Sequence, residues 1–302
     1  MNRIIDLSIE ERGNLFEIVG NKINMHPAIV EKDFWVCYTL DYLFHRCQWK
    51  DAFVFKGGTS LSKAYHVIKR FSEDIDLILD WRLIEFEEGE PWLDRTNTQQ
   101  DKFNKKMNGM AADFLSETFV SRMCTDFKNE LGIIPNIHID ETDAQTVCFE
   151  YPQLFSIGYL RQEIRLEIGP IAEWTPSHKK NIRSYVSATF PEIVEDDTSE
   201  IRTVDMERTF WEKTTILHKI ANRDISKQFP PRYSRHYYDL YCMYNSEVRQ
   251  RAYDNSELLE RDVAFKKKFY YAKGAGYDTA AIGTMRLMPQ KDDIDKLKND
   301  YL

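Results

Sequence analysis

Two carboxylates, Asp74 and Asp76, stand two residues apart with the apolar Ile75 between them. Residues 75 to 79 have the composition of a strand, and side chains two apart on a strand point to the same face. Two carboxylates held this close repel each other, and a divalent cation relieves the repulsion. Because the ligands would all be oxygens, the pair predicts a site for Mg²⁺ or Mn²⁺. The alternative is a solvated strand edge, since an isolated Asp-x-Asp is common.

A glycine turn precedes the two aspartates. A short expected strand at residues 53 to 55 ends at Gly57 and Gly58, and residues 60 to 70 have helical spacing. Glycine lets the backbone approach a ligand closely, and a helix N-terminus presents free N–H groups to an anion. The turn therefore predicts a phosphate cradle, with an ordinary strand–helix turn as the alternative. The spacing excludes a Walker P-loop, because residue 62 is Ser and residue 64 is Ala.

Lys213 stands within an apolar stripe of helical spacing, formed by Met206, Phe210, Leu217 and Ile220. A lysine on a buried stripe needs an anionic partner or a path for its ammonium group to solvent. A triphosphate would supply that anion, which makes Lys213 a candidate site residue. The alternative is a structural lysine whose side chain reaches past the core to water.

The elements that must position these residues divide the chain into two halves. Residues 27 to 46 form an expected helix, with Glu31 and Lys32 on its polar side and Asp33 in its apolar arc, where a buried carboxylate needs a partner. Period-two alternation from 133 to 169 is typical of strands. Helical patterns follow over 203 to 221, 233 to 244 and most of 256 to 302. We therefore expect an α+β fold with a mixed β-sheet flanked by helices in residues 1–195 and a helical domain in residues 196–302.

The composition narrows the class of protein. The 302 residues carry 41 basic and 49 acidic side chains, a formal charge of −8, and 42% are hydrophobic. This is enough apolar material for a core. The excess of acidic side chains excludes a protein that coats nucleic acid non-specifically, but it does not exclude local basic patches. The sequence has no apolar run of bilayer length, no signal-peptide pattern and five scattered cysteines. We expect a cytoplasmic protein with free thiols and no membrane partner.

Taken together, the motifs resemble a known enzyme family. The order of strand, Gly-Gly turn, helix and Asp-x-Asp strand is similar to that of the nucleotidyltransferase superfamily. The fuller set, which runs from about residue 31 to 244, resembles the AbiEii/AbiGii toxin family of nucleotidyltransferases. The segments that carry the resemblance are EKDFWV (31–36), FKGGTSLSK (55–63), RFSEDIDL (70–77), WEK (211–213) and YDLY (238–241).

The resemblance implies a Mg²⁺-dependent (or Mn²⁺-dependent) enzyme that moves a nucleoside monophosphate from an NTP to an acceptor and releases pyrophosphate. The catalytic residues it implies are Asp74, Asp76, Lys213 and Asp239. The nucleotide-binding residues it implies are Lys56, Gly57, Gly58, Thr59, Ser60, Ser72 and Lys213. Asp239 would accept a proton, position Lys213 or orient the acceptor hydroxyl. The alternative for Asp239 is a surface carboxylate paired with Arg235 or His236.

The same resemblance calls for a third acidic residue on a neighbouring strand, as a metal ligand beside Asp74 and Asp76. In residues 162 to 168 apolar and charged residues alternate, so one face of this expected strand is charged. Glu167 is the first choice and Glu163 the second, with Arg165 between them. The alternative is that this face is simply solvated.

The resemblance also implies a biological role. It points to the toxin of a bacterial toxin–antitoxin or phage abortive-infection system, neutralised by a separately encoded antitoxin. Family members modify tRNA 3′ ends, so a tRNA or another RNA is the expected acceptor. Local cations such as Arg232, Arg235 and Lys266 to Lys268 would have to bind it.

The sequence is compatible with two other functions. One is a small-molecule nucleotidyltransferase of the aminoglycoside-modifying kind, which would share the first-half chemistry but needs a closed acidic pocket for a cationic acceptor. The other is a non-catalytic module that binds NTP or a partner protein. The presence of both Asp74 and Asp76 argues against that module, because a degenerate relative would be expected to lose one of them.

Overall fold

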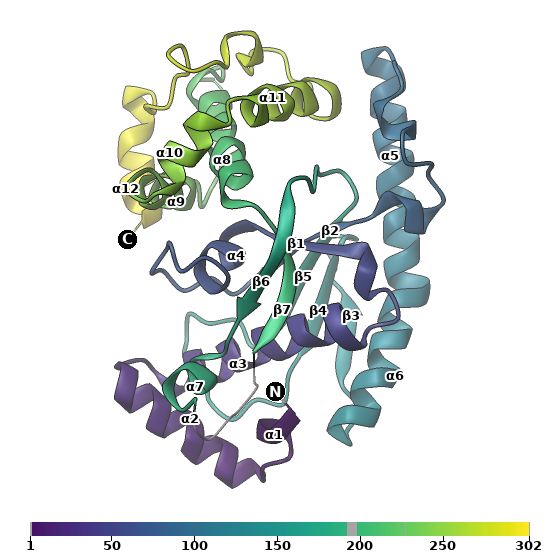
Figure 1. Cartoon of the computed structure of the whole chain (residues 1–302), viewed down its shortest axis with the longest axis vertical. Helices are drawn as coiled ribbons and strands as arrows, with labels where there is room; N and C mark the ends of the chain where they lie inside the picture. Colours follow the sequence, from purple (N-terminus) through teal and green to yellow (C-terminus); the bar gives the residue numbers. More distant parts are fainter. Residues whose placement is uncertain (1, 192–197, 227, 302) are drawn as a thin grey trace.

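The computed structural model describes residues 2–191, 198–226 and 228–301. In this part of the chain, seven strands form one mixed sheet in the order β3-β4-β5-β2-β1-β7-β6 (Figure 1). The predicted α+β fold class is confirmed. The strands are β1 (Phe53–Lys56), β2 (Ile75–Leu79), β3 (Asn136–Ile139), β4 (Thr146–Glu150), β5 (Ile164–Gly169), β6 (Ser177–Ile182) and β7 (Ser199–Val204).

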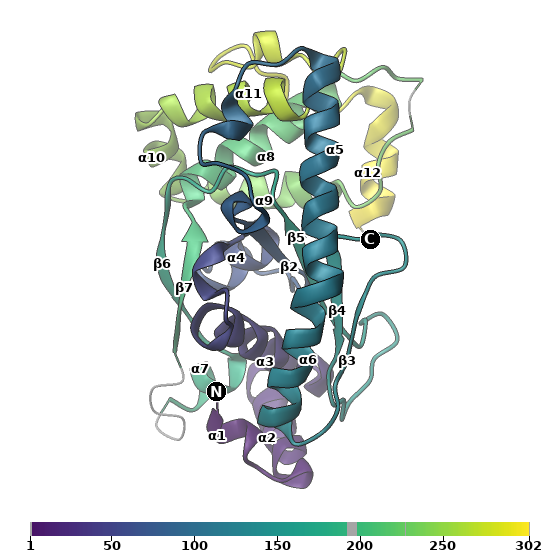
Figure 2. The same ribbon diagram turned by 90° about the vertical axis from the view of Figure 1, so that its right-hand side faces the viewer.

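Helices flank the sheet and extend beyond it at two opposite ends. α1, α2 and α7 gather at one end, and α8 to α12 gather at the other (Figure 1). α5 and α6 form a long column beside the sheet, joined by a π-helical turn at Leu115–Phe119 (Figure 2). No helix in the described ranges is long and apolar enough to cross a membrane. The α-helices are α1 (Asn2–Ile5), α2 (Ile9–Ile23), α3 (Pro27–Asp41), α4 (Gly57–Lys63), α5 (Asn97–Phe114), α6 (Val120–Leu131), α7 (Tyr185–Thr189), α8 (Met206–Ala221), α9 (Ser234–Tyr244), α10 (Val248–Asp254), α11 (Glu257–Phe269) and α12 (Ile294–Tyr301).

The register at the centre of the sheet brings three charged residues into one row. β1 pairs with β2 in antiparallel fashion, and Lys56 lies opposite Asp76. β2 pairs with β5 in parallel, and Asp76 lies opposite Glu167. Because directly opposite residues project to the same face of a sheet, the three side chains stand side by side.

The other face of the same strands is apolar and carries the main core. Phe55, Leu77 and Leu166 are buried there and belong to one hydrophobic cluster with Trp35 of α3 and Phe127 of α6. Fully burying a side chain of this size stabilises the fold by about 1.5–3 kcal/mol. The alternation of apolar and charged residues predicted for residues 162 to 168 is thus a division between the core and an open polar face.

The helical half has a core of its own that reaches back to the sheet half. Phe210 and Trp211 of α8 pack with Leu240 of α9, and the same cluster includes Leu61 and Ile68 from the β1–β2 connection. The helical half is therefore fixed against the segment that carries the glycine turn.

Two sequence-based boundaries need correction, and a third stays a prediction. The helix expected over 60 to 70 is α4, which begins at Gly57 and ends at Lys63, and His66 beyond it has a positive φ of 54° that no α-helix accommodates. The helix expected from 203 begins at Met206, because residues 199 to 204 form β7 inside the sheet. The expected division after residue 195 lies outside the described residues, and β7 shows that the sheet continues beyond it.

The polar side expected for α3 was also wrong, because Glu31 and Lys32 are both buried. The carboxylate of Glu31 accepts hydrogen bonds from the backbone N–H groups of Leu154 and Phe155, at 2.8 and 2.9 Å. Lys32 donates to Glu73 and to the carbonyl oxygen of Arg161. These partners come from distant segments, so helical spacing alone could not reveal them.

The expectation that Asp33 needs a partner is confirmed. Asp33 is 2% exposed, and its carboxylate accepts a hydrogen bond from Lys63 Nζ at 2.6 Å and another from the backbone N–H of Tyr185 at 2.7 Å. Since Lys63 ends α4, this buried ion pair ties the helix after the glycine turn to α3.

Candidate active site

Three carboxylates meet at the edge of the sheet's polar face: Asp74, Asp76 and Glu167. Asp76 lies directly opposite Glu167 in the pairing of β2 with β5, and Asp74 immediately precedes β2. Burial raises the pKa of Asp76, opposed by Lys56 and Lys213 and reinforced by the charge of Asp74. Partial withdrawal from water, with Asp76 and Asp74 alongside, raises the pKa of Glu167 to about 7. The negative charges of Asp76 and Asp74 both act on Glu167, and a cation in the same hollow would offset that repulsion.

The glycine turn lies directly against this row. Gly57 has a φ of +78°, and a Cβ placed on it would stand 1.8 Å from Asp76 Oδ2. A Cβ on Gly58 would stand 2.7 Å from Arg70 Nη2 and 3.0 Å from Ser72 Oγ. Both glycines are therefore needed, because a side chain at either position would displace groups that face the acidic residues.

The hydroxyl groups of Thr59 and Ser60 are buried and bonded within the protein. Thr59 Oγ1 donates to the carbonyl oxygen of Asp74 at 2.5 Å and lies 2.9 Å from Ser72 Oγ. Ser60 Oγ donates to the carbonyl oxygen of Gly57 at 2.9 Å. Both side chains hold the turn and the segment before β2 in place. The predicted phosphate contacts of these two hydroxyls gain no support from this geometry.

Lys213 of α8 was expected to need an anionic partner because it lies on an apolar stripe, and Asp239 is that partner. Its Nζ lies 2.9 Å from Asp239 Oδ2, and Asp239 is completely buried on α9. The same carboxylate accepts two hydrogen bonds from Arg70, from Nε and Nη2, each at 2.9 Å. Burial raises the pKa of Asp239, but Arg70 and Lys213 outweigh it, so the pKa is lowered. Of the roles expected for Asp239, the contacts favour positioning: it fixes two cations side by side.

His236 stands next to this pair, with Nδ1 at 3.3 Å from Lys213 Nζ. Burial and the positive charge of Lys213 lower the pKa of His236 to about 3. The imidazole is therefore neutral at physiological pH and adds no charge beside Lys213.

These groups surround one hollow of about 250 Å³, which we call the basic cleft. It brings together the sequence-predicted Asp74, Asp76, Glu167, Lys213, Gly58 and Ser72, with Asp239 behind them. Its lining residues are Gly58, Arg70, Ser72, Asp74, Asp76, Glu167, Lys213, Pro231, Arg232, Tyr233, Arg235 and His236. The cleft thus joins acidic residues from β2 and β5 to cations from α8, α9 and the loops beside them.

Lys56 and Glu163 lie outside the basic cleft. Lys56 borders a second cavity, which also touches Asp76 and Glu167. Burial works against its charge, but Glu212 and Asp76 raise the pKa of Lys56. Glu163 bonds to Arg165 at 3.1 Å and precedes β5 by one residue, about 13 Å along the strand from Glu167. Between the two candidates for the third carboxylate, the geometry favours Glu167.

Sequence reasoning missed Arg70 as a site residue. It opens the segment RFSEDIDL and so was part of a quoted motif, but no periodicity pointed to its partner Asp239, 169 residues further along the chain. Arg232 and Arg235 were expected only as possible acceptor contacts, yet both line the cleft itself. Loop residues such as Arg232 carry no periodic signal that would have placed them there.

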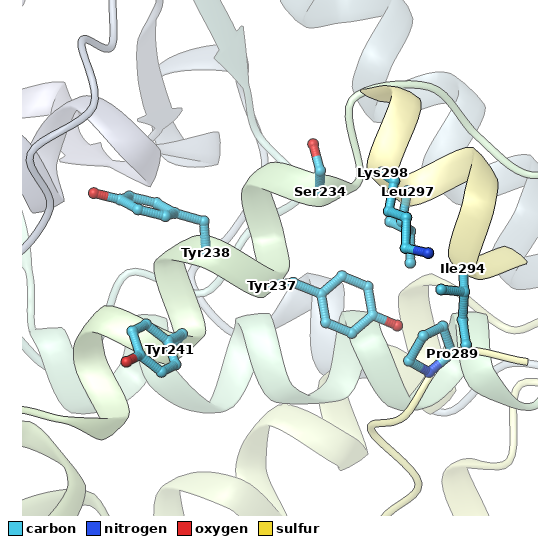
Figure 3. Close-up of a pocket in the computed structure, with 8 residues that line it drawn as sticks. All are labelled: Ser234, Tyr237, Tyr238, Tyr241, Pro289, Ile294, Leu297 and Lys298. Atoms are coloured by element: carbon cyan, nitrogen blue, oxygen red, sulfur yellow. The ribbon is translucent and has the colours of Figure 1, made fainter. Parts of the chain in front are cut away.

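An apolar hollow lies elsewhere, and its described lining residues include none of these charged groups. It has a volume of about 510 Å³ and lies between α9 and α12, lined by tyrosines of α9, by Pro289 and by apolar residues of α12 (Figure 3). Lys298 is the only charged residue among its described lining residues. A triphosphate and a metal ion would find no suitable set of ligands there.

Comparisons with known proteins agree with this geometry. A comparison with curated protein sequences finds no match. The solved structure of MenT4, a nucleotidyltransferase toxin from Mycobacterium tuberculosis H37Rv, is similar with a TM-score of 0.51 at 13% identity, over 94% of this chain and 86% of that one. At this identity the likeness shows the shared fold.

A family model described as the nucleotidyl transferase AbiEii toxin of type IV toxin–antitoxin systems matches residues 41–301. The match includes the glycine turn, the acidic row and the Arg70–Asp239–Lys213 contacts, and it leaves the charged residues of α3 outside. The chain therefore belongs to the AbiEii family of nucleotidyltransferase toxins, whose members are NTP-dependent enzymes.

Proposed function

We propose that this toxin transfers a nucleoside monophosphate from an NTP to the 3′ end of a tRNA, with Mg²⁺ or Mn²⁺ as its cofactor. The observation that carries the proposal is the basic cleft, where Asp74, Asp76 and Glu167 face Arg70 and Lys213. A separately encoded antitoxin would limit the reaction in the cell, as the type IV toxin–antitoxin family implies.

The donor set fits a divalent cation. Asp74, Asp76 and Glu167 offer carboxylate oxygens, the ligands that Mg²⁺ and Mn²⁺ prefer, and their crowding makes a positive ion favourable. When bound, the cation would neutralise part of the triphosphate charge and lower the pKa of the acceptor hydroxyl. The protein's part is to hold the three carboxylates in place through the β2–β5 pairing and the Thr59 contact with Asp74.

The cations of the cleft would bind the triphosphate. Asp239 fixes Arg70 and Lys213 before any ligand arrives, so little side-chain freedom is lost on binding. Fixed charges near the site where negative charge develops stabilise the transition state. Gly58 and Ser72 line the same side of the cleft and complete the cradle that the glycine turn predicts.

An RNA acceptor fits the open, cationic rim of the cleft better than a small cationic molecule does. Arg232 is half exposed at the rim, and its Nη2 lies 3.9 Å from Asp74 Oδ2. Arg235 lines the cleft from the first turn of α9. Both arginines would attract phosphate and repel an aminoglycoside-like cation.

Transfer to RNA can be tested directly. The protein is incubated with each labelled NTP in turn, with Mg²⁺ and total RNA, and the products are separated by size. We expect label in a band of tRNA length, and no label with the Asp76→Asn variant. No label on RNA with any of the NTPs would contradict the proposal.

A further inference from the structure

A second hollow, the rear cavity, adjoins the basic cleft at Asp76 and Glu167. Its volume is about 200 Å³, and both carboxylates line it as well as the basic cleft. Its other walls include Lys56, Asp143, Gln145 and the aromatic ring of Tyr270. The two metal-ligand candidates thus form a partition between two hollows.

The charges of the two hollows differ. The basic cleft has Arg70 and Lys213 in its walls, which suit a triphosphate, and Arg232 and Arg235 add two further cations at its rim. Among the described residues that line the rear cavity, Lys56 is the cation, and Asp143 adds a carboxylate to the two shared ones. A triphosphate would be repelled there, whereas an uncharged, hydroxyl-bearing group would not.

In nucleotidyl transfer the attacking and leaving oxygens lie roughly in line on opposite sides of phosphorus. With the leaving pyrophosphate in the basic cleft, the attacking hydroxyl must approach from the opposite direction. The rear cavity is a second hollow bordered by the same carboxylates, Asp76 and Glu167, so it offers a separate place for that hydroxyl.

Tyr270 gives the rear cavity a surface for a base. It follows the last residue of α11, and its side chain remains 47% exposed. Its hydroxyl donates to the carbonyl oxygen of Ile171 at 2.6 Å, which fixes the orientation of the ring. Tyr271, 60% exposed, follows it, and Lys267 is exposed one turn earlier. Exposed aromatic rings beside cations are typical of surfaces that bind single-stranded RNA.

α5 and α11 lie side by side, and both are connected to residues of the rear cavity (Figures 1 and 2). Asn104 of α5 donates to the carbonyl oxygen of Phe269 at 2.8 Å, next to Tyr270. Gln145, in the cavity wall, lies 3.4 Å from Asn108 of α5. The end of α11 is therefore held beside the cavity.

We propose that the rear cavity binds the 3′-terminal nucleoside of the RNA acceptor, with its base on the ring of Tyr270 and its ribose hydroxyl beside Glu167. This inference rests on the proposed function. The acceptor oxygen forms a bond to the α-phosphorus as the bond from that phosphorus to the bridging oxygen of the β-phosphate breaks. Pyrophosphate leaves through the basic cleft, and the hydroxyl proton passes to water.

The test separates acceptor binding from nucleotide binding. In Tyr270→Ala, we expect the KM for tRNA to rise about tenfold or more, as is typical when one stacked base loses its aromatic partner. The KM for NTP should stay within twofold of the wild type. Tyr270→Phe keeps the ring and should recover most of the acceptor affinity. Tyr244→Ala removes a tyrosine of similar exposure, 45%, from the end of α9 and should change neither constant.

Binding without turnover makes the outcome independent of the proposed reaction. Fluorescence anisotropy of labelled tRNA is measured with the Asp76→Asn protein, with and without Tyr270→Ala, and without NTP. If RNA binding depends on Tyr270 but the wild-type protein transfers no nucleotide to RNA, only the proposed reaction is overturned. Equal RNA affinity with and without the ring, or a loss of NTP binding in Tyr270→Ala, would overturn the rear-cavity inference.

Discussion

The charged residues of α3 and those of the basic cleft are held in opposite ways. On α3, Glu31, Lys32 and Asp33 are buried, and each is bonded to groups of the protein itself. In the cleft, Asp74, Asp76 and Glu167 line one hollow, and burial together with the negative charges of Asp76 and Asp74 raises the pKa of Glu167 to about 7. The first set is satisfied within the fold, whereas the second favours a cation from outside. A charged motif therefore indicates chemistry only when its charges lack compensation inside the protein.

The two regions are nevertheless connected. Lys32 bonds to Glu73, the residue before Asp74, and Asp33 bonds to Lys63 at the end of α4. The charges of α3 thus support the two segments that carry the acidic row and the glycine turn. If the comparison holds, changes on α3 should act mainly on stability, with a small effect on transfer where Lys32 bonds to Glu73, and changes in the cleft should act mainly on transfer.

The largest effect on stability should come from Asp33→Asn. The substitution leaves Lys63, which is 5% exposed, as a buried charge without its partner. Breaking a buried ion pair from one side costs about 3–5 kcal/mol. Urea unfolding monitored by circular dichroism should show that loss, while transfer per folded molecule changes little. An Asp33→Asn protein as stable as the wild type, or one that is folded but inactive, would remove the contrast between the regions.

Lys213→Met should have the converse effect. Methionine fits the apolar stripe of α8, and Asp239 keeps Arg70 as its partner, so the fold should persist. Losing a positioned charge beside the triphosphate should lower kcat/KM for NTP by about 10²-fold. Lys128→Met, at an exposed position of α6, is the control. A Lys213→Met protein that melts earlier but turns over normally would make Lys213 structural.

The smallest effect should come from Lys32→Met, because Lys32 bonds to Glu73, the residue before Asp74, and to none of the described residues that line the cleft. We expect transfer to fall about fivefold, which corresponds to about 1 kcal/mol. The double variant Lys32→Met/Glu73→Gln distinguishes this route from others. If Lys32 positions Asp74 through Glu73, the double variant should be no slower than Lys32→Met alone. If the effects of the two substitutions on the transfer rate multiply in the double variant, Lys32 must influence the site through a residue other than Glu73.

The sequence predicts the parts of this site that depend on local patterns. The glycine turn, the Asp-x-Asp strand and the alternation around Glu167 each lie within a few residues, where backbone periodicity decides which face a side chain takes. Lys213 was found the same way, from its place on an apolar stripe. The fold class was also predicted from local patterns, namely the helical and strand periodicities of the segments.

The remaining features depend on contacts between distant segments. Arg70 meets Asp239 across 169 residues, and Lys32 meets the carbonyl of Arg161 across 129. No spacing rule relates such pairs, so Arg70 was not assigned a role and Lys32 was placed on a polar face. The start of α8 was misjudged because β7 is drawn into the sheet by its pairing with β1 and β6.

The most direct test of the account compares Mn²⁺ binding to the wild type and to the Asp76→Asn variant. The EPR signal of the free ion measures the affinity for Mn²⁺, and thermal unfolding measures the stability of each protein with and without the metal. We predict that the variant loses at least tenfold in Mn²⁺ affinity, while its metal-free form is as stable as the wild type or more so, because repulsion in the acidic row is relieved. Mn²⁺ should raise the melting temperature of the wild type only. Equal Mn²⁺ affinity in the two proteins would contradict the account, because the cleft carboxylates would then have no need of a cation.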